Sequence, residues 1–195
     1  MEEKLKQGDS NCIKIVLFGP ESTGKTTLAK QLSRHYKTFW VPEYSRAYAE
    51  RNLEANLSLT KDDVLPIAIG QMKLENELAQ KTDSILICDT DLLETKVYAE
   101  FYYPNYSNPV LEKFAVLNSY DLYFLTDINI PWDYDGIRDK PNEREGMFKA
   151  FEDALIKYKK PYVLLKGNKN ERFNLAVSYI DNLLNENDIC FKKKT

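Results

Sequence analysis

The sequence predicts a three-layer α/β/α fold built on a five-stranded parallel sheet. Short apolar runs rich in β-branched and aromatic residues alternate along the chain with longer segments of helical periodicity. Such alternation is typical of parallel sheets that helices cover on both faces. A glycine-containing segment, GPESTGKT at residues 19–26, joins the first apolar run to the first helical segment. In such folds the functional residues follow the carboxyl ends of the strands.

Strands are expected at residues 13–18, 38–41, 84–88, 121–125 and 162–165. Helices are expected at residues 25–36, 45–52, 61–81, 92–101, 109–118, 143–158 and 170–186. Residues 126–142 form a long segment without periodicity, and a loop of this length in a compact domain usually serves as a lid or a binding loop. We expect a domain at residues 13–188 with a lid at about 126–146, an N-terminal tail at 1–12 and a C-terminal tail at 189–195.

Length and composition limit the class of protein. The 195 residues suit one domain, and an apolar content of 43% is typical of a globular protein. A net charge of −3 argues against a nucleic-acid-binding surface, and no apolar run approaches the roughly 18 residues of a membrane span. The three cysteines are widely spaced and form no C-x-x-C pair, which is typical of reduced thiols. We expect a cytoplasmic protein with neither a nucleic-acid nor a membrane partner.

The segment GPESTGKT fits the G-x-x-x-x-G-K-T pattern of a phosphate-binding loop. A strand delivers the segment and a helix leaves it, so backbone N–H groups and a helix N-terminus together form a cradle for an anion. Lys25 is expected to reach the β- and γ-phosphate oxygens of a nucleotide, and the Thr26 hydroxyl to bind Mg²⁺. The expected nucleotide-binding residues are Gly19, Glu21, Ser22, Thr23, Gly24, Lys25, Thr26 and Thr27.

Carboxylates follow the second and third strands. Glu43 is expected either to accept the proton of a substrate hydroxyl or to act only as a favourable charge at a helix N-terminus. Directly after Glu43, Tyr44 and Arg46 are expected to help bind the substrate. Asp89 ends an apolar strand, as in a Walker B motif, and is expected to support Mg²⁺. Asp91 is expected either to contact the substrate or to cap the next helix.

The loop after the fourth strand carries Trp132, Arg138 and Arg144. Phosphoryl transfer needs cations over the γ-phosphate, which Arg138 and Arg144 would supply from a closing lid unless they are solvated loop arginines. Trp132 is expected to contact the substrate. The same loop contains a D-x-x-G sequence at residues 133–136, but its place after the fourth strand rather than the third argues against a GTPase switch.

Four segments of the chain resemble the ribosylnicotinamide kinase domain of NadR-type proteins. They are GPESTGKT, EYSRAY, CDTDLLETKVY and PWDYDGIR, in the same order and at similar spacing, and the resemblance covers residues 13–184. It implies a P-loop kinase fold and transfer of the ATP γ-phosphoryl group to the 5′-hydroxyl of nicotinamide riboside, a step of NAD salvage. It also implies ATP at residues 19–27, Mg²⁺ at Asp89, the ribosyl hydroxyls at Glu43 and Asp91, and a lid with Arg138 and Arg144.

The sequence departs from that family where two aromatic residues stack on the pyridinium ring. Pro42 replaces a Trp, and in a rough alignment Glu77 stands in place of a Tyr. The H-x-G-H signature of an adenylyltransferase is also absent from these residues, so adenylylation to NAD is not expected. The aromatic residues that would compensate for the missing stack are Trp40, Tyr44, Tyr48, Tyr102, Tyr103 and Tyr106.

Three functions therefore stay open for the chain. The first is an ATP- and Mg²⁺-dependent kinase acting on nicotinamide riboside, and the second is the same chemistry on another small acceptor, such as thiamine or a nucleoside. The third is a nucleotide-dependent switch or regulatory ATPase, which would need no small-molecule acceptor.

Overall fold

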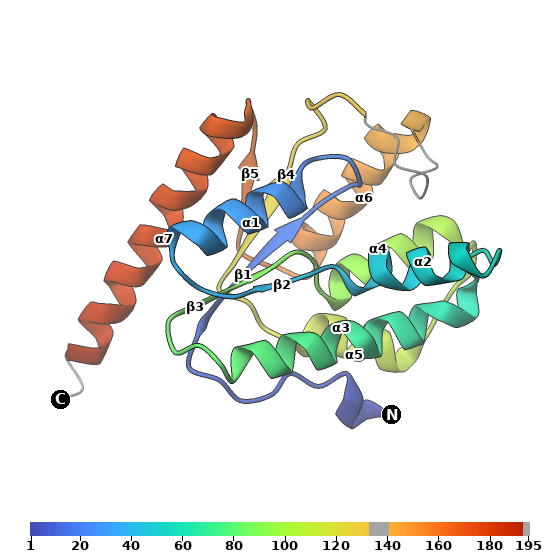
Figure 1. The fold of residues 1–195 in the computed structure, drawn as a ribbon, viewed down its shortest axis with the longest axis horizontal. Helices are drawn as coiled ribbons and strands as arrows, with labels where there is room; N and C mark the ends of the chain where they lie inside the picture. The colour runs from blue at the N-terminus through green and yellow to red at the C-terminus, as the bar shows by residue number, and fades with distance from the viewer. Residues whose placement is uncertain (133–140, 193–195) are drawn as a thin grey trace.

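The computed structural model describes residues 1–132 and 141–192. At its centre is a five-stranded sheet in the order β2-β3-β1-β4-β5, in which every neighbouring pair of strands is parallel (Figure 1). The predicted α/β/α fold with a five-stranded parallel sheet is therefore confirmed. The strands are β1 (Ile13–Phe18), β2 (Trp40–Val41), β3 (Ile85–Cys88), β4 (Leu122–Thr126) and β5 (Tyr162–Leu165).

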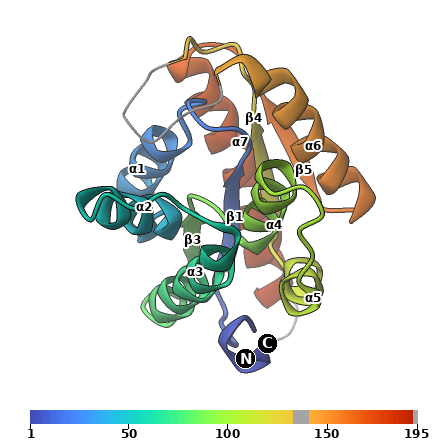
Figure 2. The ribbon, with the colours of Figure 1, turned by 90° about the vertical axis from the view of Figure 1, so that its right-hand side faces the viewer.

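Helices cover both faces of the sheet and form two separate hydrophobic clusters with it. Side chains of α1 and α7 build one cluster, and those of α3, α4, α5 and α6 build the other. Helix α2 runs beside α3 (Figure 2). The helices are α1 (Lys25–His35), α2 (Tyr44–Glu54), α3 (Val64–Ala79), α4 (Leu92–Tyr102), α5 (Pro109–Leu117), α6 (Arg144–Lys157) and α7 (Lys169–Lys192).

The central strand β1 shows how the apolar runs of the sequence produce this arrangement. Every residue of β1 is buried. Because successive side chains of a strand point to opposite faces, Ile15 and Leu17 join the cluster with α1 and α7, while Val16 and Phe18 join the other. A strand that is covered on both faces needs a continuous apolar run, and this is the pattern found in the sequence.

The observed elements differ from the predicted ones mainly at their ends. Strand β2 has two residues instead of the four predicted. A short 3₁₀ helix, Lys61–Asp63, precedes α3, and Thr60 and Asp63 form a reciprocal capping box at its start. Helix α7 continues to Lys192, beyond its predicted end at residue 186, and extends past the sheet (Figure 1).

The segment predicted as an N-terminal tail packs against the domain. The side chain of Leu5 is fully buried, and Gln7 Nε2 donates a hydrogen bond of 2.8 Å to Glu75 Oε1. Glu75 is itself fully buried, with the Tyr120 hydroxyl donating to Oε2 at 2.7 Å and Lys14 Nζ at 3.5 Å from Oε1. The segment is thus held against α3, and Lys14 at the start of β1 reaches the same buried carboxylate.

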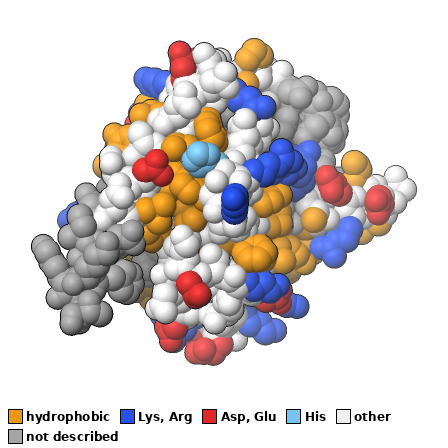
Figure 3. All heavy atoms as spheres, turned by 60° about the vertical axis from the view of Figure 1, so that its left-hand side comes forward, with side chains coloured by type: hydrophobic (Ala, Val, Ile, Leu, Met, Phe, Trp, Pro, Cys, Tyr) orange, Lys and Arg blue, Asp and Glu red, His pale blue; other side chains and the backbone are white. Residues whose placement is uncertain are grey.

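The face over α1 and α7 carries the single histidine of the sequence. His35 ends α1, and its ring meets Phe173 of α7 edge to face, with 5.5 Å between the ring centroids. Figure 3 shows His35 on the surface among hydrophobic side chains.

Within the described residues, we find no helix with the length and apolarity that a membrane crossing requires.

Candidate functional site

The phosphate-binding loop connects β1 to α1 and depends on its glycines. Gly19 and Gly24 have φ values of +131° and +85°, a region that side chains rarely adopt. At Gly19 a Cβ atom would also lie 2.8 Å from Thr126 Oγ1 of β4. The Thr23 hydroxyl lies 2.6 Å from the same Thr126 oxygen and donates to the Pro20 carbonyl. The loop therefore closes tightly against β4.

The Lys25 side chain lies folded into the loop. Its Nζ donates to the carbonyl oxygens of Gly19 and Pro20 at 2.6 and 3.0 Å. The same nitrogen is 3.1 Å from Glu94 Oε1 of α4, and both side chains are buried. The side chain of the predicted phosphate-binding lysine is therefore fixed at the loop by two backbone carbonyls and by an ion pair with Glu94.

Three carboxylates determine the charge state of Lys25. Burial lowers the pKa of its ammonium group, but the carboxylates raise it by more, and the net pKa lies above its ordinary value. The carboxylates belong to Glu94, Glu43 and Asp89. Lys25 is therefore a permanent cation at neutral pH.

Asp89 directly follows β3, and its backbone N–H donates to the Val41 carbonyl at 2.9 Å. Its side chain is fully buried, and neither carboxylate oxygen makes a regular hydrogen bond to another described residue. Burial and the negative charge of the neighbouring Glu43 raise the pKa of Asp89 to about 7. The Thr26 hydroxyl and the positive charge of Lys25 lower this pKa, but by less. A buried carboxylate of this kind has coordination positions left for a cation.

The chemistry of Asp89 and Thr26 fits Mg²⁺. Magnesium prefers oxygen ligands and usually takes one or two from the protein, with the rest from phosphates and water. In the described part of the chain, no group of three or more His, Cys, Asp or Glu side chains is arranged to hold a metal alone. A magnesium ion here would therefore depend on the oxygens of a bound nucleotide.

Glu43 precedes α2 and lines a cavity that also borders the phosphate-binding loop. It makes no side-chain capping bond to α2, and the Ser45 hydroxyl donates to its Oε1 at 2.6 Å. The next residue anchors this segment to α3. Tyr44 N–H donates to Gln71 Oε1 at 2.8 Å, and its ring lies over Gly70, where a Cβ would come within 2.1 Å of a ring carbon. Glu43 is thus held at the cavity by the packing of α2 on α3.

The cavity has a volume of about 450 Å³ and extends from the loop between α2, α3 and α4. Its wall beyond the loop is mostly apolar and aromatic. The leucines 53, 57 and 59 at its rim are well exposed. Its other lining residues include Arg46, Ala49, Val64, Ile67, Gln71, Thr90, Thr95, Tyr98, Ala99, Tyr102 and Tyr103.

Asp91 has a different place from the one predicted at a substrate. Glu94 N–H donates to its Oδ1 at 2.8 Å, and the Tyr123 hydroxyl donates to its Oδ2 at 2.7 Å. Its side chain is 1% exposed and is not part of the cavity wall. The alternative that Asp91 caps the following helix is confirmed. The substrate contact is not supported, because both carboxylate oxygens are used inside the protein.

Arg144 is the lid arginine that the structure brings to the loop. It begins α6, and its guanidinium donates to the carbonyl oxygens of Ile130 and Ser22 at 2.9 and 3.3 Å. Burial lowers the pKa of Arg144, although a nearby carboxylate opposes the effect. The Trp132 ring lies 5.7 Å from this guanidinium and does not line the cavity. Arg138 lies outside the described residues.

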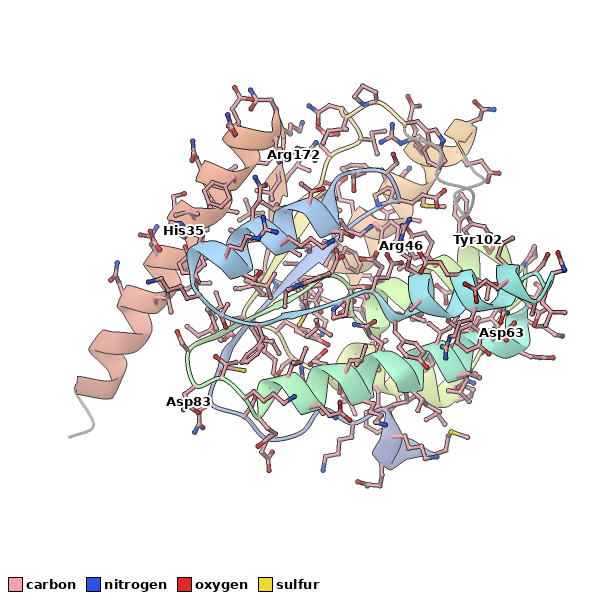
Figure 4. All side chains as sticks on the ribbon, in the orientation of Figure 1. His35, Arg46, Asp63, Asp83, Tyr102 and Arg172 are labelled. Carbon is pink, nitrogen blue, oxygen red and sulfur yellow. The ribbon has the colours of Figure 1, made fainter. Side chains whose placement is uncertain are left out.

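Arg46 and Tyr102 line the cavity from opposite helices, α2 and α4 (Figure 4). Arg46 also pairs with Glu50 one turn along α2, with 3.4 Å between Nε and Oε1. Glu77 does not line the cavity. It lies on the outer face of α3, half exposed and 3.8 Å from Lys73 Nζ. Glu77 therefore does not lie where it could stack on, or pair with, a ring held in this cavity.

The aromatic wall of the cavity also differs from the expectation. Tyr102 and Tyr103 line the cavity, and so does Tyr98, which the sequence analysis did not single out. All three come from α4 or its C-cap. The other aromatic residues considered above are not part of the wall; they are Trp40, Tyr44, Tyr48 and Tyr106.

Sequence reasoning also missed Arg172, which is 3% exposed near the start of α7 (Figure 4). Its guanidinium donates to three backbone carbonyls: Thr23 of the loop at 2.8 Å, Asp127 after β4 at 2.8 Å and Gly167 after β5 at 3.0 Å. One side chain thus joins the phosphate-binding loop to the ends of two strands. The available signal was its position shortly after a strand end, where this fold places functional residues.

The chain is similar in sequence to a protein of known function. The chain is 27% identical over 158 residues to the trifunctional NAD biosynthesis/regulator protein NadR of Salmonella typhimurium (strain LT2). The match covers 80% of this chain and 36% of that protein, so the chain spans about a third of this curated relative's length.

Solved structures show the same fold. A crystal structure of NadR in complex with NR matches with a TM-score of 0.76 at 21% identity, covering 89% of this chain and 51% of that one. A deoxyadenosine kinase from M. mycoides matches with a TM-score of 0.61 at 17% identity, covering 87% and 100%. Residues 14–172 match a family model described as an AAA domain. The chain thus belongs to the AAA domain family of P-loop proteins and is homologous to part of NadR, as the resemblance of its four segments indicated.

Proposed function

We propose that this protein is an ATP-dependent kinase that phosphorylates a hydroxyl group of a small molecule, and that nicotinamide riboside is this acceptor. The observation that carries the proposal is the cavity of about 450 Å³, which the phosphate-binding loop and Glu43 border together. A nucleotide on the loop and an acceptor in this cavity would meet at Glu43. The homology to NadR, a protein of NAD biosynthesis that has been crystallised with NR, supports nicotinamide riboside as the acceptor.

The residues at the junction have the chemistry that phosphoryl transfer requires. Lys25, at the loop and permanently charged, would bind the phosphate oxygens of ATP, and Arg144 beside Ser22 would add a second cation. Mg²⁺ held through Asp89 and Thr26 would neutralise charge on the phosphates. Glu43 would orient the acceptor hydroxyl and take its proton. Asp91 has no part in this scheme, because it caps α4.

The cavity wall would hold the ring of the acceptor between α3 and α4. Val64 and Ile67 of α3 line the cavity, and so do Tyr98 and Tyr102 of α4. Aromatic and apolar side chains of this kind bury a flat ring efficiently. The exposed leucines at the rim, residues 53, 57 and 59, would be covered when an acceptor fills the cavity.

The proposal is tested by ADP release from Mg-ATP with purified protein. Nicotinamide riboside, thiamine and a panel of nucleosides are each added, and Lys25→Ala serves as the blank. The expected result is strong stimulation by nicotinamide riboside and none in the variant. Stimulation only by another compound would reassign the cavity but keep the chemistry. If no compound stimulates ADP release although ATP binds, the protein is a switch or a regulatory ATPase.

A further inference from the structure

Gln71 is a buried residue of the cavity wall, and the oxygen of its side-chain amide already has a hydrogen-bond partner in the protein. Its side chain is 1% exposed, and its Oε1 accepts the Tyr44 N–H at 2.8 Å. A backbone N–H can bond only to the oxygen of an amide, so this contact determines which way the group points. The NH₂ group of Gln71 is therefore the end turned away from the Tyr44 backbone.

That NH₂ group has no hydrogen-bond partner among the residues that the structure describes. A buried donor without a partner is rare in folded proteins and costs stability. Gln71 is on the same face of α3 as Val64 and Ile67, and all three line the cavity, as does Tyr98 of α4. The unpaired donor is thus a polar group in a mostly apolar part of the wall, where an acceptor ring would be held.

We infer that Gln71 recognises the phosphoryl acceptor, by donating a hydrogen bond from Nε2 to a carbonyl oxygen on the edge of its ring. The ligand class is a flat ring that carries a carboxamide or a ring carbonyl, and the carboxamide of nicotinamide riboside belongs to it. This inference rests on the proposed function and adds the residue that selects the substrate. A site with a buried donor discriminates strongly against an analogue without the matching acceptor, because binding that analogue leaves the donor unpaired.

The experiment compares nicotinamide riboside with pyridine riboside, which has the same ring and ribose but no carboxamide. Wild-type protein is expected to prefer nicotinamide riboside in kcat/KM by at least about tenfold, as one buried hydrogen bond allows. In Gln71→Glu, measured at pH 8, an oxygen still accepts the Tyr44 N–H, but the donor is gone. This variant is expected to lose the preference and to keep the KM for ATP. Gln80→Glu is the matched control, since Gln80 ends the same helix outside the cavity and donates to the Asp9 carbonyl.

The outcomes separate this inference from the proposed function. Equal use of both compounds by the wild type, or an unchanged preference in Gln71→Glu, would overturn the role of Gln71 and leave the kinase proposal intact. An equal loss of activity on both compounds with the preference retained would show that Gln71 supports the site without recognising the ring, which also overturns the inference. Turnover of neither compound by the wild type would overturn the proposed substrate, and the inference with it.

Discussion

The phosphate-binding loop and the wall of the cavity border one space, but they are built in different ways. The loop consists of backbone held in place: Gly19 lies against Thr126, and Arg172 bonds to the carbonyl of Thr23. The cavity wall consists of side chains from three helices, α2, α3 and α4. A local sequence pattern encodes the loop, whereas tertiary packing selects the wall. We therefore expect the loop to provide the nucleotide chemistry and the wall to determine which molecule is phosphorylated.

The largest effect is expected at Glu43, where the two regions meet. Glu43→Gln keeps the size of the side chain but removes the base, so kcat should fall by about 10²- to 10⁴-fold. ATP binding should change little, because Glu43 is not part of the loop. Steady-state kinetics and ATP titration measure the two effects, with Glu54→Gln at the exposed end of α2 as control. A normal kcat in Glu43→Gln would remove Glu43 from the chemistry.

The next effect concerns the loop alone. In Arg172→Lys one ammonium group replaces a guanidinium that bonds to three carbonyls, and it cannot reach all of them. The KM for ATP should rise by about tenfold, since leaving buried polar groups unpaired costs roughly 1–3 kcal/mol. The KM for the acceptor should stay near its wild-type value. Arg34→Lys, exposed near the end of α1, is the control, and an unchanged KM for ATP in Arg172→Lys would contradict this role.

A smaller effect is expected in the wall, through the contact between α2 and α3. Gly70→Ala would place a Cβ 2.1 Å from the Tyr44 ring, so the ring or the two helices must shift. Overpacking of this kind typically costs about 1–3 kcal/mol of unfolding free energy. Gly146→Ala in α6 is the matched control: its Cβ would meet the Phe101 ring at 4.0 Å, and alanine favours a helix. Urea unfolding should show opposite signs for the two variants, and equal stability of both would refute the close contact.

A pH-dependent effect on stability is predicted at Asp89. The folded protein raises the pKa of Asp89 from 3.8 to about 7, so ionisation of this group costs stability progressively as the pH rises between these values. Asp89→Asn removes the cost. Without metal or nucleotide, the stability gained by the variant should be larger at pH 8 than at pH 5, by roughly 2–3 kcal/mol. Asp83→Asn, exposed before β3, is the control, and an equal gain at both pH values would contradict the buried carboxylate.

The parts of the fold and site that could be predicted are those with a local signal. The apolar run of β1 gave a buried strand, and the carboxylate directly after β3 was expected at the position that Asp89 takes. The contacts that escaped prediction join distant segments. Asp91 is bound by Tyr123 and Arg172 by Thr23, and no local pattern marks either pair.

The wall of the cavity was also hard to predict, because it depends on contacts between distant segments. Glu77 fits a rough alignment but faces outward, whereas Gln71, on the same helix, lines the cavity. The helical period places these two residues on different faces, yet only the packing of α2 and α4 determines which face of α3 is the inner one. Under the proposed function, the part of the molecule that would select the substrate is therefore the part that its sequence describes least directly.

The kinase proposal requires that the cavity beside the loop hold a hydroxyl acceptor for the γ-phosphoryl group. Mass spectrometry of the products formed from Mg-ATP and nicotinamide riboside tests this claim most directly. We predict that wild-type protein forms nicotinamide mononucleotide and ADP in equal amounts, and that Lys25→Ala forms neither. Release of ADP and inorganic phosphate at the same rate with and without nicotinamide riboside, and with no mononucleotide formed, would contradict it.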